Sequence, residues 1–201
     1  MSAGPDVTWH AGAVDAAFRA RAAGRRGVTV WLTGLSGAGK STISVAAERA
    51  IVGLGIPALR LDGDNLRHGL NADLGFDAAG RAEAVRRAGE AALLLAESGA
   101  VALVAMISPY RADRDRVRAR HAAAGVTFLE VHVDASLATA ESRDPKGLYA
   151  KARRGELKGF TGIDDPYEAP ASPEIHLRTD AEPVERSVAA LVDAIASATR
   201  T

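Results

Sequence analysis

Short apolar runs alternate with longer, more polar segments along most of the chain. Residues 28–33 (VTVWLT) form the clearest run, and its compact, β-branched composition is typical of a buried strand. The segments between the runs are rich in alanine, which favours helices. The pattern predicts strands at 28–33, 57–62, 101–107, 126–133 and 174–178, and helices at 41–54, 81–97, 111–124 and 183–198.

This order of elements predicts an α/β fold, with a mainly parallel five-stranded sheet that helices cover on both faces. We expect residues 28–201 to form this single domain. Residues 1–27, with Trp9 and Phe18 as large apolar anchors, predict an N-terminal arm or a marginal helix. Ligands of such sheets bind beyond the carboxyl ends of the strands, so functional residues are expected there.

The end of the first strand carries a phosphate-binding pattern. Residues 34–41 (GLSGAGKS) fit G-x-x-x-x-G-K-[ST] and lead into the first helix. Glycines let backbone N–H groups surround a phosphate, and the helix N-terminus attracts the anion. We expect Lys40 to reach the β- and γ-phosphates of ATP and the Ser41 hydroxyl to bind Mg²⁺, which an ordinary Gly-rich turn would not explain. The predicted nucleotide-binding residues are Gly34, Leu35, Ser36, Gly37, Ala38, Gly39, Lys40, Ser41 and Thr42.

The phosphate loop alone serves hydrolases, GTPases and small-molecule kinases. A polar, Gly-rich segment at about 143–170 favours a kinase, because such enzymes need a lid that keeps water off the γ-phosphate. Two carboxylates follow the second strand. Asp64 could hold Mg²⁺ through water or accept a proton from a substrate hydroxyl. Asp62 could do either, or could cap a helix.

Composition narrows the possible classes. The absence of cysteine excludes disulfides, thiolate metal sites and a cysteine nucleophile. The 25 acidic and 25 basic residues balance, which disfavours a nucleic-acid partner. No apolar run approaches the ~20 residues of a membrane span, and the N-terminus lacks a signal-peptide pattern. We therefore expect a soluble, cytoplasmic protein that binds neither nucleic acid nor membrane.

The positions of the lysines suggest a function, whereas those of the histidines do not. Only four of the 25 basic residues are lysines, one in the phosphate loop and three at 146–158. Because a compact ammonium suits phosphate, Lys40, Lys146 and Lys158 are interpreted as phosphate contacts, with a background arginine bias as the alternative. Lys151 is expected on a solvated helical face. The histidines, which show no metal-ligand spacing and are assigned only packing or surface roles, are His10, His68, His121, His132 and His176.

Longer stretches resemble one enzyme family. They are 73–76 (DLGF), 107–111 (ISPYR), 143–149 (RDPKGLY) and 155–168 (GELKGFTGIDDPYE). Together with the phosphate loop, they make the chain similar to adenylylsulfate (APS) kinases over roughly residues 9–198. The resemblance implies a P-loop kinase, usually a homodimer, that uses ATP and Mg²⁺ to phosphorylate the 3′-hydroxyl of adenosine 5′-phosphosulfate. The product would be 3′-phosphoadenosine 5′-phosphosulfate of sulfate assimilation, and a sulfurylase is a partner that the resemblance suggests.

The resemblance also implies roles at the acceptor site. Phe76 and Phe160 match a pair that sandwiches the acceptor adenine, and loop anchors are the alternative. Arg67 and Arg81 match phosphosulfate contacts, since a guanidinium bonds oxyanions in pairs, and a solvated helix face is the alternative. Ser108 matches a serine for which the family suggests a phosphoserine intermediate, although in-line transfer needs positioning more than a nucleophile.

Ser108 and the Ile107 backbone could therefore simply position the acceptor. We assign catalytic roles to Lys40, Asp64 and Ser108, and Mg²⁺ to Ser41 and Asp64. Arg143 is predicted to contact the nucleotide. The predicted substrate-binding residues are Asp62, Arg67, Phe76, Arg81, Ile107, Ser108, Lys146, Lys158 and Phe160.

Two positions depart from the family pattern. Gly80 stands where the family usually has Asp, and Ala84 where it usually has an acceptor-binding Asn. A lost hydrogen bond to ligand costs about 0.5–1.5 kcal/mol, which would weaken the acceptor site. One alternative is therefore a related kinase for another 5′-substituted nucleoside. A second, separate alternative is a non-catalytic ATP-binding regulatory protein, which the retention of Lys40, Ser41, Asp62, Asp64 and the lid disfavours.

Overall fold

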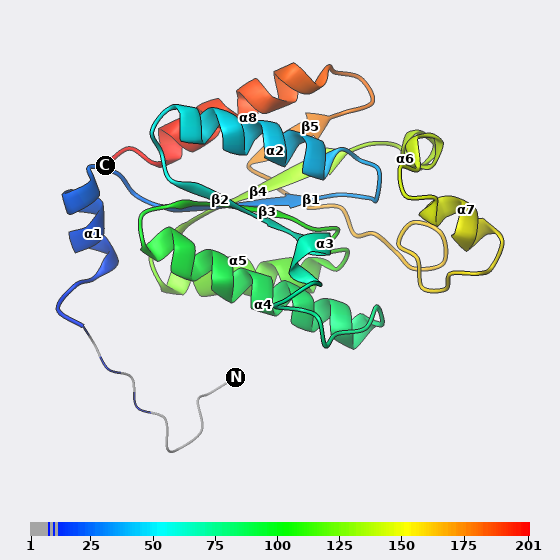
Figure 1. Ribbon diagram of the computed structural model, residues 1–201, viewed down its shortest axis with the longest axis horizontal. Helices are drawn as coiled ribbons and strands as arrows, with labels where there is room; N and C mark the ends of the chain where they lie inside the picture. Colours follow the sequence, from blue (N-terminus) through cyan, green and yellow to red (C-terminus); the bar gives the residue numbers. More distant parts are fainter. Residues whose placement is uncertain (1–7, 9, 11) are drawn as a thin grey trace.

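Five parallel strands form one sheet in the order β2-β3-β1-β4-β5 (Figure 1). The computed structural model describes residues 8, 10 and 12–201, so Trp9 lies outside the described residues. The α/β fold and the five predicted strands are confirmed. The strands are β1 (Val28–Thr33), β2 (Ala58–Asp62), β3 (Val101–Ala105), β4 (Thr127–Asp134) and β5 (Ile175–Arg178).

Helices cover both faces of this sheet (Figure 1). Helices α2 (Lys40–Gly53) and α8 (Val184–Ala198) pack on one face, and α4 (Ala78–Glu97) and α5 (Arg111–Ala123) on the other. Alternate residues of β1 serve the two cores, because successive strand side chains point to opposite faces. Leu32 packs with α2 and α8, whereas Trp31 packs with α4 and α5. Among the described residues, no helix has the length and apolar character needed to cross a membrane.

Several element bounds differ from the prediction. Helix α4 begins three residues earlier than predicted, because the Asp77 carboxylate caps it by accepting from the Gly80 N–H at 2.7 Å. Strand β3 ends at Ala105, which leaves Met106 and Ile107 in the loop that follows. Helices missing from the prediction are α3 (Gly63–Leu66), α6 (Leu137–Arg143) and α7 (Leu148–Arg153), all too short to show a clear apolar periodicity.

The N-terminal segment contains the predicted marginal helix, α1 (Ala16–Ala23), which has no buried residue. Asp15 caps its start, and Gly24 ends it in a left-handed conformation, with φ of 65°. The backbone N–H of Arg26 donates to the Thr199 carbonyl at 2.9 Å, which joins this segment to the end of α8.

The predicted lid, residues 143–170, lies with α6 and α7 on the right of Figure 1. It is not a simple loop, because α7 and the chain after it pack with α6 around a small apolar cluster. This lid cluster consists of Ala140, Tyr149, Ala152 and Phe160. The lid therefore has a packed interior that can hold its inner face in one shape.

Candidate active site

A cavity of about 1130 Å³ lies between the phosphate loop, the ends of β2 and β3, the start of α4 and the lid. It collects most of the predicted site residues, which come from distant parts of the sequence. Those that line it are Ser36, Gly37, Gly39, Lys40, Ser41, Thr42, Asp62, Asp64, Arg67, Phe76, Arg81, Ile107, Ser108, Arg143, Lys146, Lys158 and Phe160.

Three predicted loop residues support the loop rather than line the cavity. Ala38 is buried in the core, and Leu35 packs against both that core and the lid cluster. Gly34 lies against β4 so closely that a Cβ there would be 2.3 Å from the Val133 carbonyl oxygen. Only glycine fits at that position, and this explains one glycine of the motif by packing rather than by phosphate contact.

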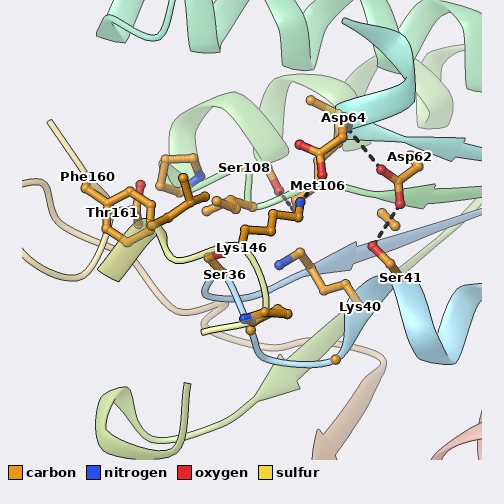
Figure 2. Close-up of a pocket in the computed structure, with 18 of the residues that line it drawn as sticks. Ser36, Lys40, Ser41, Asp62, Asp64, Met106, Ser108, Lys146, Phe160 and Thr161 are labelled. Carbon is orange, nitrogen blue, oxygen red and sulfur yellow. Dashed lines mark hydrogen bonds and ion pairs between the residues drawn. The ribbon is translucent and has the colours of Figure 1, made fainter. Parts of the chain in front are cut away.

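The phosphate loop holds Lys40 above its own backbone. The Lys40 Nζ donates to the carbonyls of Gly34 at 2.8 Å and Leu35 at 2.7 Å. Burial, helped by the positive charge of Lys146, lowers the pKa of Lys40 from 10.5 to about 7, against the attraction of nearby carboxylates. Figure 2 shows both lysines in the cavity. Two cations held close together in this way favour a polyanionic ligand between them.

Asp62 and Asp64 have different environments. The buried Asp62 accepts from the Ser41 hydroxyl at 2.8 Å, and its other oxygen caps α3 by accepting from the Asp64 N–H (Figure 2). It also accepts from Arg60 Nη1 at 2.8 Å. Asp64 is 64% exposed and forms an ion pair with Lys146 of the lid. The prediction paired Ser41 with Asp64 as metal ligands, but the side chain that contacts Ser41 is Asp62. Capping, one of the two sequence alternatives for Asp62, is therefore confirmed, and the same side chain lines the cavity.

Ser108 is held in a strained, buried conformation after β3. Its φ of 40° is the left-handed region, and it is only 3% exposed. The Trp31 indole N–H donates to its Oγ at 3.0 Å, and Arg114 Nη1 donates to its carbonyl at 2.6 Å. Arg114 is itself buried and paired with Glu130 at 2.7 Å. Trp31, Arg114 and Glu130 were not predicted, since nothing in the charged pattern at 111–124 shows which arginine is buried.

Arg81 joins the start of α4 to the lid. Its Nη1 donates to Thr161 Oγ1 at 2.7 Å and to Asp165 Oδ2 at 2.8 Å, and its Nη2 donates to the Gly159 carbonyl. Its Nε donates to the Phe76 carbonyl at 2.8 Å. Most of the guanidinium is therefore engaged by the protein, even though the side chain lines the cavity.

The two predicted aromatic residues differ in burial. Phe76 is 66% exposed, and the Arg67 guanidinium lies 3.8 Å from its ring centroid. Phe160 is 6% exposed and meets Tyr149 edge to face at 4.9 Å within the lid cluster. Both line the cavity, so Phe160 serves as a loop anchor and as a cavity wall at once.

The remaining basic residues divide between the cavity and the surface. Arg143 donates to the Gly37 carbonyl at 3.3 Å and to the Thr179 carbonyl at 2.6 Å, beside the phosphate loop. Lys158 lines the cavity, whereas Lys151 is exposed. The exposed pair that Arg86 forms with Glu83 is typical of a solvated helix face.

The two departures from the family pattern both lie near the start of α4. Ala84 is buried and lines the cavity next to Arg81. A Cβ at Gly80 would come within 2.7 Å of the Gly75 carbonyl oxygen, so this turn requires glycine as it stands. The alanine removes a polar side chain from the wall, while the glycine permits a tighter approach of the 75–80 turn.

A phosphate loop that opens α2, carboxylates at the end of the outer strand β2 and a predicted lid segment that lines the same cavity define a P-loop kinase of small molecules. The family model for adenylylsulphate kinase matches residues 26–178. The chain therefore belongs to the adenylylsulphate kinase family.

Individual relatives agree with this assignment. The adenylyl-sulfate kinase of Aeromonas hydrophila is 52% identical over 195 residues, which cover 97% of this chain and 96% of the relative. That of Saccharomyces cerevisiae is 52% identical over 182 residues, covering 90% and 89%. The solved APS kinase of Mycobacterium tuberculosis, in complex with AMPPNP and APS, is 52% identical with a TM-score of 0.81, covering 84% of this chain and 96% of that one. The predicted family, fold and enzyme class are confirmed.

Proposed function

We propose that this protein transfers the γ-phosphoryl group of ATP to the 3′-hydroxyl of adenosine 5′-phosphosulfate. The observation that carries the proposal is a single cavity that joins a phosphate loop to an aromatic and arginine-rich wall under one lid. Its volume of about 1130 Å³ lies above the ~300–1,000 Å³ usual for small-molecule pockets, which supports a site for more than one ligand. The relative from Mycobacterium tuberculosis, solved with AMPPNP and APS, supports the same pair of ligands.

The nucleotide half is built on the phosphate loop. Backbone N–H groups at the start of α2 and the Lys40 ammonium bind the phosphates of ATP, and Arg143 closes the loop from the side. Ser41 and Asp62 fit Mg²⁺, because they present a hydroxyl and a buried carboxylate oxygen 2.8 Å apart. Mg²⁺ bound there would neutralise charge on the β- and γ-phosphates. This assignment moves the metal role from Asp64 to Asp62.

The acceptor half uses the other carboxylate. Asp64 lies at the start of α3 with its carboxylate open to the cavity, so it can accept the proton of the attacking 3′-hydroxyl. Lys146 balances its charge and brings the lid over the reacting groups. Phe76 and Arg67 form a stacked surface for the acceptor adenine and its anionic groups.

Ser108 acts by position rather than as a nucleophile in this proposal. Its hydroxyl is buried and already accepts the Trp31 N–H, and in-line transfer needs aligned groups and neutralised charge more than a covalent intermediate. The strained turn then presents the 106–108 backbone to the acceptor at the wall of the cavity.

Turnover with purified protein tests the proposal. Mg-ATP and APS are expected to give ADP and 3′-phosphoadenosine 5′-phosphosulfate with saturation in APS, and AMP is expected to be a poor acceptor. Turnover with another 5′-substituted nucleoside but not with APS would show that the acceptor is a different nucleoside. Tight ATP binding without any product would favour the alternative of a non-catalytic regulatory protein.

The oligomeric state and the sulfurylase partner rest on the resemblance, and the location rests on the sequence composition. A homodimer, association with a sulfurylase and a cytoplasmic location are part of the same proposal. Light scattering of the purified chain tests the first of these, and a monomer at micromolar concentration would overturn it.

A further inference from the structure

Two histidines and an aspartate converge outside the cavity, on the edge strand β5 and its neighbour β4. His132 of β4 and His176 of β5 are register partners in the parallel sheet, so their side chains leave the same face. Asp134 follows His132 by two residues and shares that face. These three residues are the metal-ligand cluster found within the described part of the chain, and spacing along the sequence did not indicate it.

The side chains of the cluster already point toward one another. The His176 Nε2 lies 2.9 Å from Asp134 Oδ2, and the His132 Nε2 lies 4.0 Å from Asp134 Oδ1. The two imidazole rings stack with centroids 5.0 Å apart and planes 12° apart. The carboxylate therefore lies close to the Nε2 atoms of two rings whose backbones the sheet holds in register.

We propose that His132, Asp134 and His176 form a binding site for a divalent transition-metal ion of the Zn²⁺ class. Two imidazole nitrogens and a carboxylate oxygen are a ligand set that suits such ions, whereas Mg²⁺ prefers oxygen ligands alone. The three ligand atoms lie within 4.8 Å of one another. Around Zn²⁺, with bonds of about 2.0–2.2 Å, they would stand roughly 3.3 Å apart, which small rotations of the half-exposed Asp134 and His176 supply.

The site differs from the kinase cavity in position and in chemistry. None of its three residues lines that cavity, and they face away from α2 and α8, since the alternate residues Val131 and Val133 pack on those helices. Exposure of His176 and Asp134 leaves room for water as a further ligand, so the ion would exchange with solvent rather than be enclosed.

A metal ion here would act on the strand pair that supports the phosphate loop. The Asp134 carbonyl accepts from the Thr179 N–H at 2.9 Å, and the Thr179 hydroxyl donates to the Ala38 carbonyl of the loop at 2.8 Å. An ion that joins β4 to β5 would therefore stabilise the backbone that supports the phosphate loop. The expected effect is on thermal stability as well as on metal binding.

Cobalt titration of untagged, nucleotide-free protein tests the site. Excess Mg²⁺ is present throughout, so that the oxygen ligands of the cavity are saturated. The expected result is one equivalent of Co²⁺ with visible d–d absorption, displaced by Zn²⁺, and a rise in Tm with Zn²⁺. His176→Gln and Asp134→Asn are each expected to lower the affinity at least about 10-fold.

His68→Gln is the matched control, because it also removes an exposed histidine, but one that is not part of the His132–Asp134–His176 cluster. It is expected to bind Co²⁺ as the unmodified protein does. Absence of saturable Co²⁺ absorption in the unmodified protein would overturn the proposal, and so would equal affinity in His176→Gln. Either outcome would leave the cluster as a His176–Asp134 hydrogen bond beside two stacked histidines.

Discussion

Replacing Lys40 by methionine should make the nucleotide-free protein more stable, although it should abolish kinase activity. The lysine is held in a buried place where its pKa falls from 10.5 to about 7. Burial in this place penalises the charged form, and phosphate is what normally offsets that penalty. Without a nucleotide, the buried ammonium of Lys40 therefore destabilises the folded protein, because no phosphate is present to offset its desolvation.

The structure sets the size of the effect. The lowered pKa of Lys40 corresponds to a penalty of roughly 5 kcal/mol on the charged form relative to the unfolded chain. Methionine removes this penalty but also removes two hydrogen bonds to the Gly34 and Leu35 carbonyls, which contribute about 1 kcal/mol each. Lys40→Met is therefore expected to raise the free energy of unfolding by about 3 kcal/mol at pH ~7.

The sign of the pH dependence provides the stricter test. Because the pKa is lower in the folded state, the penalty is complete below pH ~7 and disappears as pH approaches 10.5, where the unfolded lysine also loses its proton. Urea unfolding followed by circular dichroism should show the gain at pH ~7 and almost none at pH ~9.5. The exposed Lys151→Met is the control, with a change within about 0.5 kcal/mol at both values. A Lys40→Met protein no more stable than the original at pH ~7 would refute the reasoning.

Three further predictions concern the loaded enzyme. ATP binding should be accompanied by uptake of close to one proton near pH ~8.5, because the phosphates restore the charge of Lys40. Calorimetry in two buffers of different ionisation enthalpy measures this uptake, and zero uptake would contradict a Lys40 pKa of about 7. Asp64→Asn should lower kcat about 10²–10⁴-fold with little change in ATP affinity, and an unchanged kcat would remove Asp64 from the mechanism. Phe76→Ala should raise the KM for APS roughly 5–150-fold, as the loss of about 1–3 kcal/mol of stacking requires, while the 66% exposed ring contributes little to unfolding. An unchanged KM would show that the ring does not stack on the acceptor.

The local sequence was enough to predict the sheet and its phosphate loop. The run at 28–33 becomes β1, with all six residues buried, and the glycine-rich pattern after it opens α2. These elements were predictable because a buried strand needs only an apolar run and the loop needs only glycines and a lysine at set spacing. The lysine pattern was informative too, since Lys40, Lys146 and Lys158 line the cavity and Lys151 does not.

Contacts made across the sheet were not predictable in the same way. His132 and His176 become neighbours because β4 and β5 pair in one register, which no spacing along the chain shows. The partner of Ser41 was assigned to Asp64, but β2 delivers Asp62 to it, because the strand ends at Asp62 and Asp64 already lies in the short helix α3. Helix α5 likewise carries several arginines, and the sequence does not show that Arg114 is the one that is buried in an ion pair with Glu130 of β4.

The lid is where prediction by resemblance needs the most physical correction. Arg81 and Phe160 were assigned to the substrate, and both line the cavity, but Arg81 also bonds Thr161 and Asp165, and Phe160 also packs on Tyr149. The same side chains therefore build the lid and form the wall that it presents. Substitution of either one would alter folding of the lid and binding of the acceptor together, so loss of activity alone would not separate the two roles. The Phe76 ring, in contrast, is mostly exposed and stacks on the Arg67 guanidinium rather than in the lid cluster. Acceptor stacking can therefore be measured at Phe76 without disturbing the lid.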